Sequence, residues 1–403
     1  MYITGRPSIF STTSLSSGHY GIINATWDLF KSQRPFSLHV LRDLGFGKSG
    51  LERRVQDQTL QLLDNVRKIG KDDQPFDPTD AVQFAVLNII NATLFGNTYE
   101  LGDSKITAIR DTMSDFLSAW TSALVFAIDM MPALRFVPPF RGAFLRMYGL
   151  YDKFLAFIQD RVNEKKAEFN TGEAATDFVL AYLQEMHKEV RETKFFNEWQ
   201  LTCTCVDMWF AGAETTLTTL RWALLYMIHY PEVQERVRCE ILQSLGQDHL
   251  IAMADRSAVP YTCATLNEIQ RVANIVGFNL LHETTKDVEI EGYKVKAGTM
   301  ILPQIASVLS DPDIFAVPEQ FNPERFLDSN GQLLKTEELI PFCLGKRSCL
   351  GESLARMELF IMFSSLIQNF KFKPGNENEL PTLKGKESVI RACRNYELTV
   401  EPV

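Results

Sequence analysis

The 403-residue sequence lacks any run of roughly 18 uninterrupted apolar residues, the length that a membrane-spanning helix needs. Met1 is followed at once by Tyr-Ile-Thr-Gly-Arg-Pro, which is neither a signal peptide nor an anchor pattern. It also lacks a C-x-x-C pair, and its seven Cys are scattered and odd in number. A disulfide framework is therefore not expected, a reducing compartment fits, and the chain as written is expected to be soluble and cytoplasmic.

The chain also lacks a segment with the composition of an interdomain linker, since it has no Pro-, Gly- or Ser-rich tract and no long run of charge. We therefore predict one domain over residues 1–403. Positive charge is in deficit: the formal net charge is -9, which argues against a nucleic-acid partner because such proteins usually carry a basic face. A small-molecule ligand is expected instead.

Helical periodicity dominates the long segments. The run from Glu198 to Tyr230 has no Pro and stops at Pro231, which predicts one long buried helix. Residues 350–370 are apolar nearly all round and predict a second buried helix. Strand patterns are fewer and occur late, at Val288–Val295 around a Glu-Gly turn, Thr299–Pro303, and Ser388–Val400. The fold class expected is mainly α with a minor β-sheet component.

The residues before the second of these helices carry the strongest chemical pattern. Residues 342–351 read Phe-Cys-Leu-Gly-Lys-Arg-Ser-Cys-Leu-Gly, which places Cys349 at the start of the helix. Unpaired backbone N–H groups and the positive end of the helix dipole stabilise a thiolate there. A thiolate bound to haem iron favours O–O cleavage, so the pattern predicts Cys349 as the metal ligand.

Other positions of this motif have physical roles of their own. Gly345 permits a tight turn under a porphyrin, and Gly351 lets the helix approach it closely. Arg347 supplies a cation for a haem propionate, and Phe342 opens the motif. A lone Cys near a helix start is usually only a small apolar residue, and we interpret Cys343 in that way. Neither Cys has another Cys or His at zinc-ligand spacing.

The pattern F-x-x-G-x-R-x-C-x-G is where the chain resembles the cytochrome P-450 superfamily. Judging by PFCLGKRSCLGESLARMELF, it looks most like the animal microsomal branch that oxidises drugs, fatty acids and steroids. The resemblance implies a cytochrome P-450 fold around haem b. It also implies a monooxygenase that uses one O2 and two electrons, delivered from NADPH by a reductase, with cytochrome b5 as a second electron donor.

A second motif, Ala211-Gly-Ala-Glu-Thr-Thr, stands inside the long helix. A mid-helix Thr hydroxyl can bond to the carbonyl four residues earlier, here from Thr215 to Ala211, which opens the helix locally, and Gly212 adds room. In that groove Glu214 and Thr215 could relay protons to oxygen. The motif is similar to the family's acid-alcohol pair, although a buried helix with locally satisfied polar residues is the structural alternative.

Three charged residues resemble the family's buried triad. Glu268 and Arg271 are three positions apart and hence on one helix face, and Arg325 lies within the later Phe-Asn-Pro-Glu-Arg-Phe. On an exposed helix such a pair is commonplace. In the family the triad is a structural lock rather than a catalytic group.

The resemblance also points to haem contacts elsewhere in the chain. His282 matches a position that often binds a propionate, although a lone His is more often a satisfied or surface residue. The apolar segments Val276–Leu280 and Val389–Ile390 are expected to face the haem and a hydrophobic substrate.

One family feature is altered here. The family usually has W-x-x-x-R on an early helix, with both side chains at propionates, whereas this chain has Phe30 and Arg34. Trp27 lies about one turn earlier. Pro35 disfavours helical geometry at Arg34, so its role as a haem contact is in question.

The resemblance further implies that the chain lacks the family's membrane anchor, first helix, opening strands and second helix. The cellular location that the resemblance implies is the cytoplasmic face of the endoplasmic reticulum membrane. Residues 130–140, apolar and broken by Pro, match its lipid-dipping loops, and the alternative is a core-packed connector.

Three functions remain in competition. A monooxygenase acting on hydrophobic small molecules leads. A truncated, non-catalytic haem-binding remnant is second, because of the missing elements, Phe30 and Pro35. A haem-thiolate isomerase or dehydratase is third, and the Glu214–Thr215 pair argues against it, since such enzymes can dispense with proton delivery.

Overall fold

The computed structural model describes residues 2–45, 49–71, 74–188, 195–386 and 388–403. These residues form two compact units, each built from several stretches of the chain. The first unit comprises residues 1–44, 90–211 and 280–303, and the second comprises 45–89, 212–279 and 304–403. Two helices, α4 (Thr79–Phe95) and α9 (Glu198–His229), run from one unit into the other.

Capping side chains start several helices of the first unit. Asp103 accepts hydrogen bonds from the backbone N–H groups of Lys105 and Ile106 at the start of α5, and Asp177 accepts one from Leu180 at the start of α8. Besides parts of α4 and α9, the helices of this unit are α1 (Phe10–Leu15), α2 (Trp27–Asp43), α5 (Ser104–Trp120), α6 (Ala123–Met130), the 3-10 helix η2 (Pro132–Phe136), α7 (Phe140–Glu168) and α8 (Phe178–Met186).

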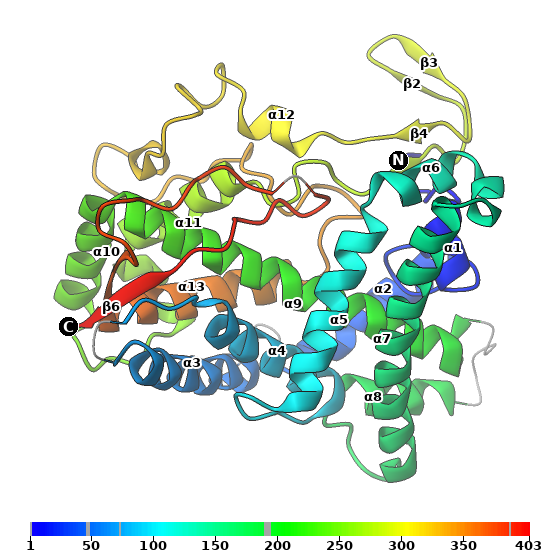
Figure 1. The fold of residues 1–403 in the computed structure, drawn as a ribbon, viewed down its shortest axis with the longest axis horizontal. Coiled ribbons are helices and arrows are strands. Elements are labelled where there is room, and N and C mark those ends of the chain that lie inside the picture. Colours follow the sequence, from blue (N-terminus) through cyan, green and yellow to red (C-terminus); the bar gives the residue numbers. More distant parts are fainter. Residues whose placement is uncertain (1, 46–48, 72–73, 189–194, 387) are drawn as a thin grey trace. The chain divides into compact units, whose positions relative to one another are not determined.

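Aromatic contacts hold these helices together. Helices α5 and α7 lie side by side (Figure 1), and Phe154 of α7 packs on Trp209 of α9 with ring centroids 5.0 Å apart. The Trp209 indole donates to Asn91 Oδ1 at 3.0 Å, so its one polar atom is satisfied in the core.

Pro35 lies inside α2, so the expectation that it disfavours helical geometry at Arg34 is wrong. Tertiary contacts keep the helix continuous. Phe36 packs edge-on against Tyr182, and Tyr182 donates its hydroxyl hydrogen to the side chain of Gln33 at 3.0 Å. This packing outweighs the loss of one backbone donor.

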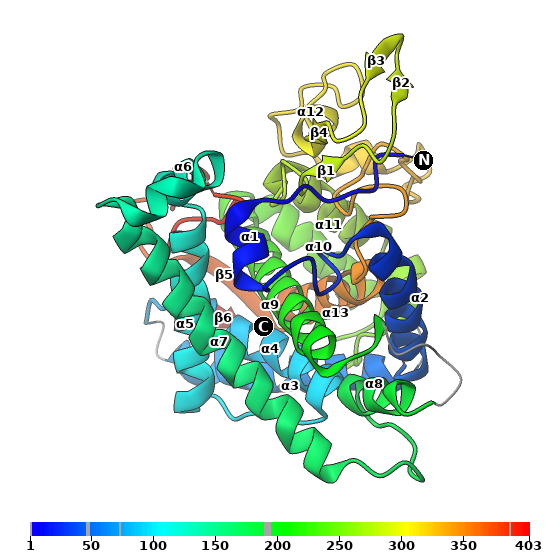
Figure 2. The same ribbon diagram turned by 90° about the vertical axis from the view of Figure 1, so that its right-hand side faces the viewer.

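The strands of the first unit are short. They are β1 (His282–Glu283), β2 (Val288–Ile290), β3 (Tyr293–Val295) and β4 (Met300–Ile301). Strand β1 pairs antiparallel with β4, and β2 with β3. The predicted hairpin at 288–295 is confirmed, and its turn uses Glu291 and Gly292 at positive φ. Figure 2 shows it extending beyond β1 and β4.

The second unit has an extensive hydrophobic core. Besides parts of α4 and α9, its helices are α3 (Ser49–Ile69), α10 (Pro231–Ser244), η4 (Met253–Ala258), α11 (Pro260–Ala273), α12 (Ile305–Leu309), η5 (Pro323–Phe326) and α13 (Glu352–Asn369). Helix α13 contacts α3, α10 and α11 and is buried on nearly all sides. The two long buried helices expected from the sequence are therefore confirmed, as α9 and α13.

The predicted strand over Ser388–Val400 is wrong for most of its length. Only β6 (Leu398–Pro402) forms, and it pairs with β5 (Phe370–Pro374), which the sequence did not reveal. Arg391 fixes the irregular stretch instead: its backbone N–H donates to Ile275 O at 2.8 Å, and its guanidinium donates to the carbonyls of Val272 and Ala273. These contacts satisfy the backbone without a ladder.

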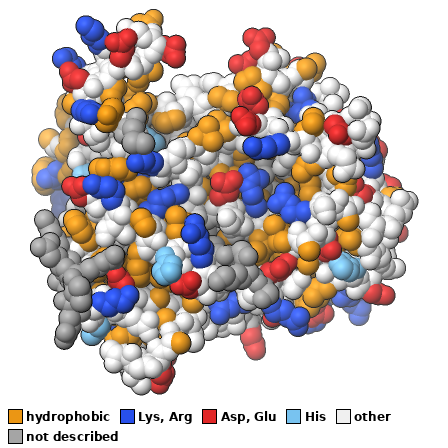
Figure 3. Space-filling view, turned by 180° about the vertical axis from the view of Figure 1, so that it is seen from behind, with side chains coloured by type: hydrophobic (Ala, Val, Ile, Leu, Met, Phe, Trp, Pro, Cys, Tyr) orange, Lys and Arg blue, Asp and Glu red, His pale blue; other side chains and the backbone are white. Residues whose placement is uncertain are grey.

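Among the helices that the structure describes, none combines the length and apolar composition that crossing a bilayer requires. On the face drawn in Figure 3, Lys and Arg side chains are interspersed with Asp, Glu and hydrophobic ones rather than gathered by sign.

Candidate functional site

The residues before α13 form a closed loop that presents Cys349. The backbone N–H of Cys349 donates to Phe342 O at 3.0 Å, and that of Ser348 donates to Gly345 O at 3.1 Å. Gly345 has a φ of +81°, so the tight turn expected there is present and requires the conformational freedom of Gly. The N-cap of α13 is Gly351, so Cys349 precedes the helix by a short turn rather than lying in it.

Cys349 differs from the other cysteines in its exposure. Its side chain is exposed, whereas those of Cys203, Cys205, Cys263 and Cys393 are buried. Burial raises the pKa of each of these four thiols, which favours inert packing residues. An exposed thiol held in a rigid loop is available as a ligand.

Neighbouring side chains brace this loop. The ring of Phe342 lies under the guanidinium of Arg356 at 4.8 Å, and Arg356 donates to Glu352 Oε1 at 2.9 Å. Phe342 is thus a support of the loop. Arg347 is buried, with 8% of its surface exposed. Cys343 is half-buried and accepts a hydrogen bond from Asn279 Nδ2, in agreement with its interpretation as a packing residue.

The acid-alcohol motif lies in α9, and its residues from Gly212 to Thr216 belong to the second unit. Burial raises the pKa of Glu214 to about 7, although the charge of Arg221 and a hydrogen bond from Thr218 favour its ionised form. Arg221 follows seven positions later, on the same face of the helix, and is buried. At neutral pH Glu214 can therefore exist both with and without its proton.

Thr215 and Gly212 lie in the same turn as Glu214. The carbonyl of Thr215 accepts a hydrogen bond from Thr219 Oγ1 at 2.8 Å. The bond from Thr215 to Ala211, and the room at Gly212, stay predictions. Thr216, the next residue, donates to Glu358 Oε2 of α13 at 2.9 Å, and both side chains are buried.

Sequence reasoning missed the functional interest of Thr216, Arg221 and Glu358. The sequence described residues 350–370 as apolar nearly all round, and no role was assigned to Glu358 in the middle of the helix. The available signal was that acid itself, because a carboxyl on a helix with no polar face must find a partner in the core.

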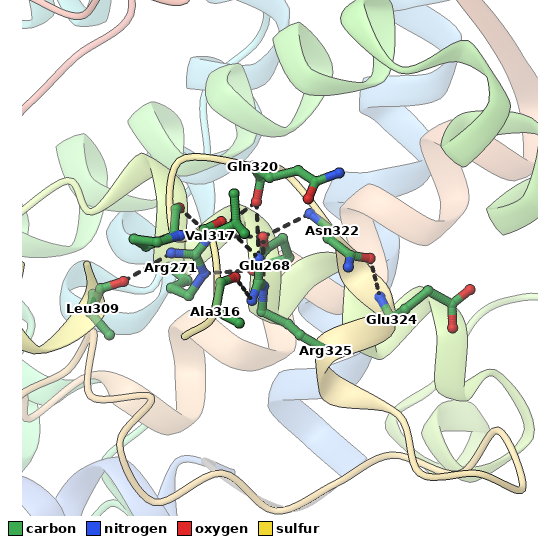
Figure 4. A network of polar contacts seen from close by, with 10 residues as sticks. Glu268, Arg271, Leu309, Ala316, Val317, Gln320, Asn322, Glu324 and Arg325 are labelled. Atoms are coloured by element: carbon green, nitrogen blue, oxygen red, sulfur yellow. Dashed lines mark hydrogen bonds and ion pairs between the residues drawn. The ribbon is translucent and has the colours of Figure 1, made fainter. Parts of the chain in front are cut away.

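The expected charged triad is present (Figure 4). Arg271 donates to Glu268 through Nε at 2.7 Å and Nη2 at 2.8 Å, and Arg325 Nε donates to Glu268 Oε1 at 3.1 Å. The side chains of Glu268 and Arg271 are 0% and 1% exposed. The remaining donors reach carbonyls of the loop before η5, among them Ala316, Pro318 and Gln320.

Two candidate haem contacts belong to the first unit. Arg34 lies on α2 with its guanidinium 5.7 Å from the centroid of the Phe30 ring, and the Trp27 ring stacks on Phe30 with centroids 5.8 Å apart. His282 is buried in β1, and its Nδ1 lies 2.8 Å from Ile3 O. A ring nitrogen facing a carbonyl donates, which fixes the tautomer with Nε2 as the acceptor in neutral His282.

The donor set of the second unit fits a haem. A thiol is presented in front of a buried helix, and a Cβ added at Gly345 or Gly351 would meet no atom within 4 Å. Leu344, beside the loop, exposes 66% of its surface and offers an apolar face. This surface suits a flat, apolar group such as a haem, whose iron would be bound by the single soft ligand that the loop presents, the Cys349 sulfur.

Comparison with known proteins agrees with this geometry. The family model described as "Cytochrome P450" matches residues 1–400. Cytochrome P450 2J2 of Homo sapiens is 38% identical over 384 residues, covering 95% of this chain and 75% of that protein. Cytochrome P450 2J3 of Rattus norvegicus is 39% identical with the same coverage, and probable cytochrome P450 CYP36A1 of Caenorhabditis elegans is 34% identical over 92% and 76%.

Proposed function

Because the chain belongs to the cytochrome P450 family, it is a haem-thiolate monooxygenase that uses haem b and electrons from NADPH, and we propose that Cys349 holds the iron. The observation that carries this assignment is the exposed thiol of Cys349, in a loop closed by its own N–H on Phe342 O. Bound haem supplies O2 activation and insertion of one oxygen atom into a substrate C–H bond, which thiolate ligation favours.

The loop determines how the thiolate is held. Because Gly345 makes the turn and the Phe342 carbonyl accepts from the Cys349 N–H, the backbone that carries the thiol is held in place. Arg347 supplies charge for a propionate. We assign the same role to His282 and Arg34 by their match to the family pattern. We propose that Gly212 leaves space beside the acid-alcohol turn.

We propose that Glu214 and Thr215 deliver protons during the reaction. Since the pKa of Glu214 is raised to about 7 by burial, its carboxyl can take a proton and release it again near neutral pH. The hydroxyl of Thr215, one position along, can hold a water molecule in line for that transfer. The family's need for protons during oxygen activation gives this turn its function.

The substrate class is a hydrophobic small molecule, such as a xenobiotic, a fatty acid or a steroid. Two apolar segments support this proposal, residues 276–280 and the stretch at Val389, which is 42% exposed. The electron donor proposed is an NADPH–cytochrome reductase, with cytochrome b5 as a second donor. Reduction of the purified protein by each donor, followed spectroscopically, tests the partners.

The test of the metal ligand is the spectrum of the reduced protein with CO. A strongly red-shifted Soret band is expected, and Cys349→Ala should abolish it while leaving the fold intact by circular dichroism. Cys343→Ala is the matched control and should keep the band. If Cys343→Ala lost the band and Cys349→Ala kept it, the ligand assignment would be wrong.

We also propose contact with a lipid surface at the endoplasmic reticulum. Helix α6, η2 and the start of α7 expose apolar side chains next to Arg135, and Phe136 and Met130 expose 68% and 64% of their surface. Apolar side chains beside basic ones suit the interface of an anionic membrane. Phe136→Ser should weaken co-sedimentation with anionic phospholipid vesicles, and Leu101→Ser, at another exposed apolar position, should not. Equal losses would refute this surface.

A further inference from the structure

A buried carboxyl joins the two helices of the proposed site within the second unit. Glu358 of α13 is 2% exposed and Thr216 of α9 is 3% exposed, and Thr216 Oγ1 donates to Glu358 Oε2 at 2.9 Å. Within the part of the chain that the structure describes, Glu358 forms no ion pair, and this hydroxyl is its hydrogen-bond partner.

Burial of the Glu358 carboxyl favours its protonated, uncharged form. An ionised carboxylate in the core without a cation is costly, so the group keeps its proton instead. Burial raises the pKa of Glu358 to about 8, and the hydrogen bond from Thr216 only partly opposes that rise. The oxygen that Thr216 contacts therefore belongs to a neutral carboxylic acid.

The position of this contact links it to the proposed chemistry. Glu358 follows Cys349 by nine positions and lies in α13, which begins just past the thiol loop. Thr216 follows Thr215 directly in α9. Successive side chains of a helix point about 100° apart, so the direction of Thr216 sets the direction of Thr215. Holding Thr216 against α13 fixes the rotation of that turn.

We propose that Glu358 is a positioning residue that holds Thr216 and so fixes the orientation of the α9 turn carrying Glu214 and Thr215. The inference rests on the proposed function, since the proton task of that turn is part of it. A residue that merely stabilised the fold would change stability without changing how electrons are divided between product and peroxide.

The experiment measures product and hydrogen peroxide formed per NADPH consumed. Thr216→Val is isosteric and lacks the donor, and Glu358→Leu lacks the acceptor. Each should lower the product-to-peroxide ratio by about fivefold, the effect of losing one hydrogen bond of ordinary net strength. Thr215→Ala serves as the reference for a fully uncoupled turn. The CO-bound spectrum should be unchanged in Thr216→Val and Glu358→Leu.

Conservative variants separate positioning from packing. Thr216→Ser keeps the hydroxyl, and Glu358→Gln keeps an uncharged acceptor, so both should retain the wild-type ratio. Thr202→Val is the matched control on α9, because Thr202 only donates to the carbonyl of Glu198 in its own helix. If Glu358→Leu does not fold, Thr216→Val compared with Thr216→Ser carries the test.

A second readout does not need turnover. Urea unfolding of Thr216→Val, Glu358→Leu and the double variant should show non-additive losses, because both changes remove one contact. Additive losses, or a haem-loaded Thr216→Val protein with the wild-type product ratio, overturn this inference alone. A wild-type protein without the thiolate spectrum overturns the proposed function and this inference with it.

Discussion

Arg271 and Glu268, one turn apart on α11, are joined by two hydrogen bonds of 2.7 and 2.8 Å with neither side chain measurably in water. Two guanidinium groups face one carboxylate, since Arg325 also contacts Glu268. The other donors of both Arg side chains reach backbone carbonyls between residues 309 and 320. The pair therefore organises a long irregular segment around a single acid.

Removing the acid should unfold this segment. Glu268→Gln leaves the buried guanidinium of Arg271 and the half-buried one of Arg325 without their counter-charge, at a cost of about 3 to 5 kcal/mol in the free energy of unfolding. Aggregated or haem-free protein is the expected product. Glu352→Gln, which loses only the half-exposed pair with Arg356, should cost under about 1 kcal/mol. Urea unfolding measures both, and equal small losses would show that the triad is dispensable.

Glu214 should set the pH dependence of coupling. Its pKa is raised to about 7, so the protonated form that gives up a proton declines as pH rises through that value. Product formed per NADPH should fall over the same range, and Glu214→Gln should give a low, flat profile. Glu198→Gln, at the exposed start of α9, should keep the wild-type inflection. If the inflection in product formed per NADPH persists in Glu214→Gln, the group that titrates is not Glu214.

Glu358 should make the protein less stable as pH rises. Between the ordinary value of 4.5 and the folded value of about 8, the unfolded chain has lost this proton and the folded one still binds it. The free energy of unfolding then falls by about 1.4 kcal/mol per pH unit in this window. Glu358→Gln should flatten the profile relative to wild type and be the more stable protein at pH 8 and above. Parallel profiles would mean that Glu358 is ionised in the fold.

Gly21 holds a loop of the first unit against α9. It has a φ of +79°, and a Cβ added there would lie 2.2 Å from Asp207 Oδ2, the atom that accepts from the N–H groups of Ile22 and Ile23. Gly21→Ala should therefore cost more than the roughly 1 to 3 kcal/mol of backbone strain alone. Gly102→Ala has a similar φ and open space, so it isolates the strain. Thermal unfolding of both variants compares them.

Local patterns were enough to predict the long elements and the thiol loop. Helix α9 follows from a Pro-free run that stops at Pro231, helix α13 follows from a run that is apolar nearly all round, and the loop before α13 has Gly at a position that needs positive φ. The charged triad could be predicted because Glu268 and Arg271 are three positions apart on a predicted helix and Arg325 lies in the later Phe-Asn-Pro-Glu-Arg-Phe motif. Each of these features is encoded within a short stretch of chain.

The errors arise where distant contacts decide. Pro35 lies within a helix because Gln33 and Phe36 are held by residues about 150 positions away. The segment after Ser388 is irregular because Arg391 binds carbonyls at the end of α11. Glu358 gained its role only when Thr216 of another helix met it. The residue pattern of one segment does not show which distant residues will contact it.

Arg391 also fixes the backbone conformation of its segment, whatever side chains its neighbours carry. Its side chain, its N–H and its carbonyl, which accepts from Trp222 Nε1 at 2.9 Å, are all engaged, so the backbone course does not depend on the neighbouring side chains. Val389, two positions earlier, can then change in size or polarity at little cost in stability. Where such a position faces a substrate, single substitutions can alter what the protein accepts without disturbing the scaffold. Divergence of substrate range is therefore easier here than in a strand, where every second side chain supports the core.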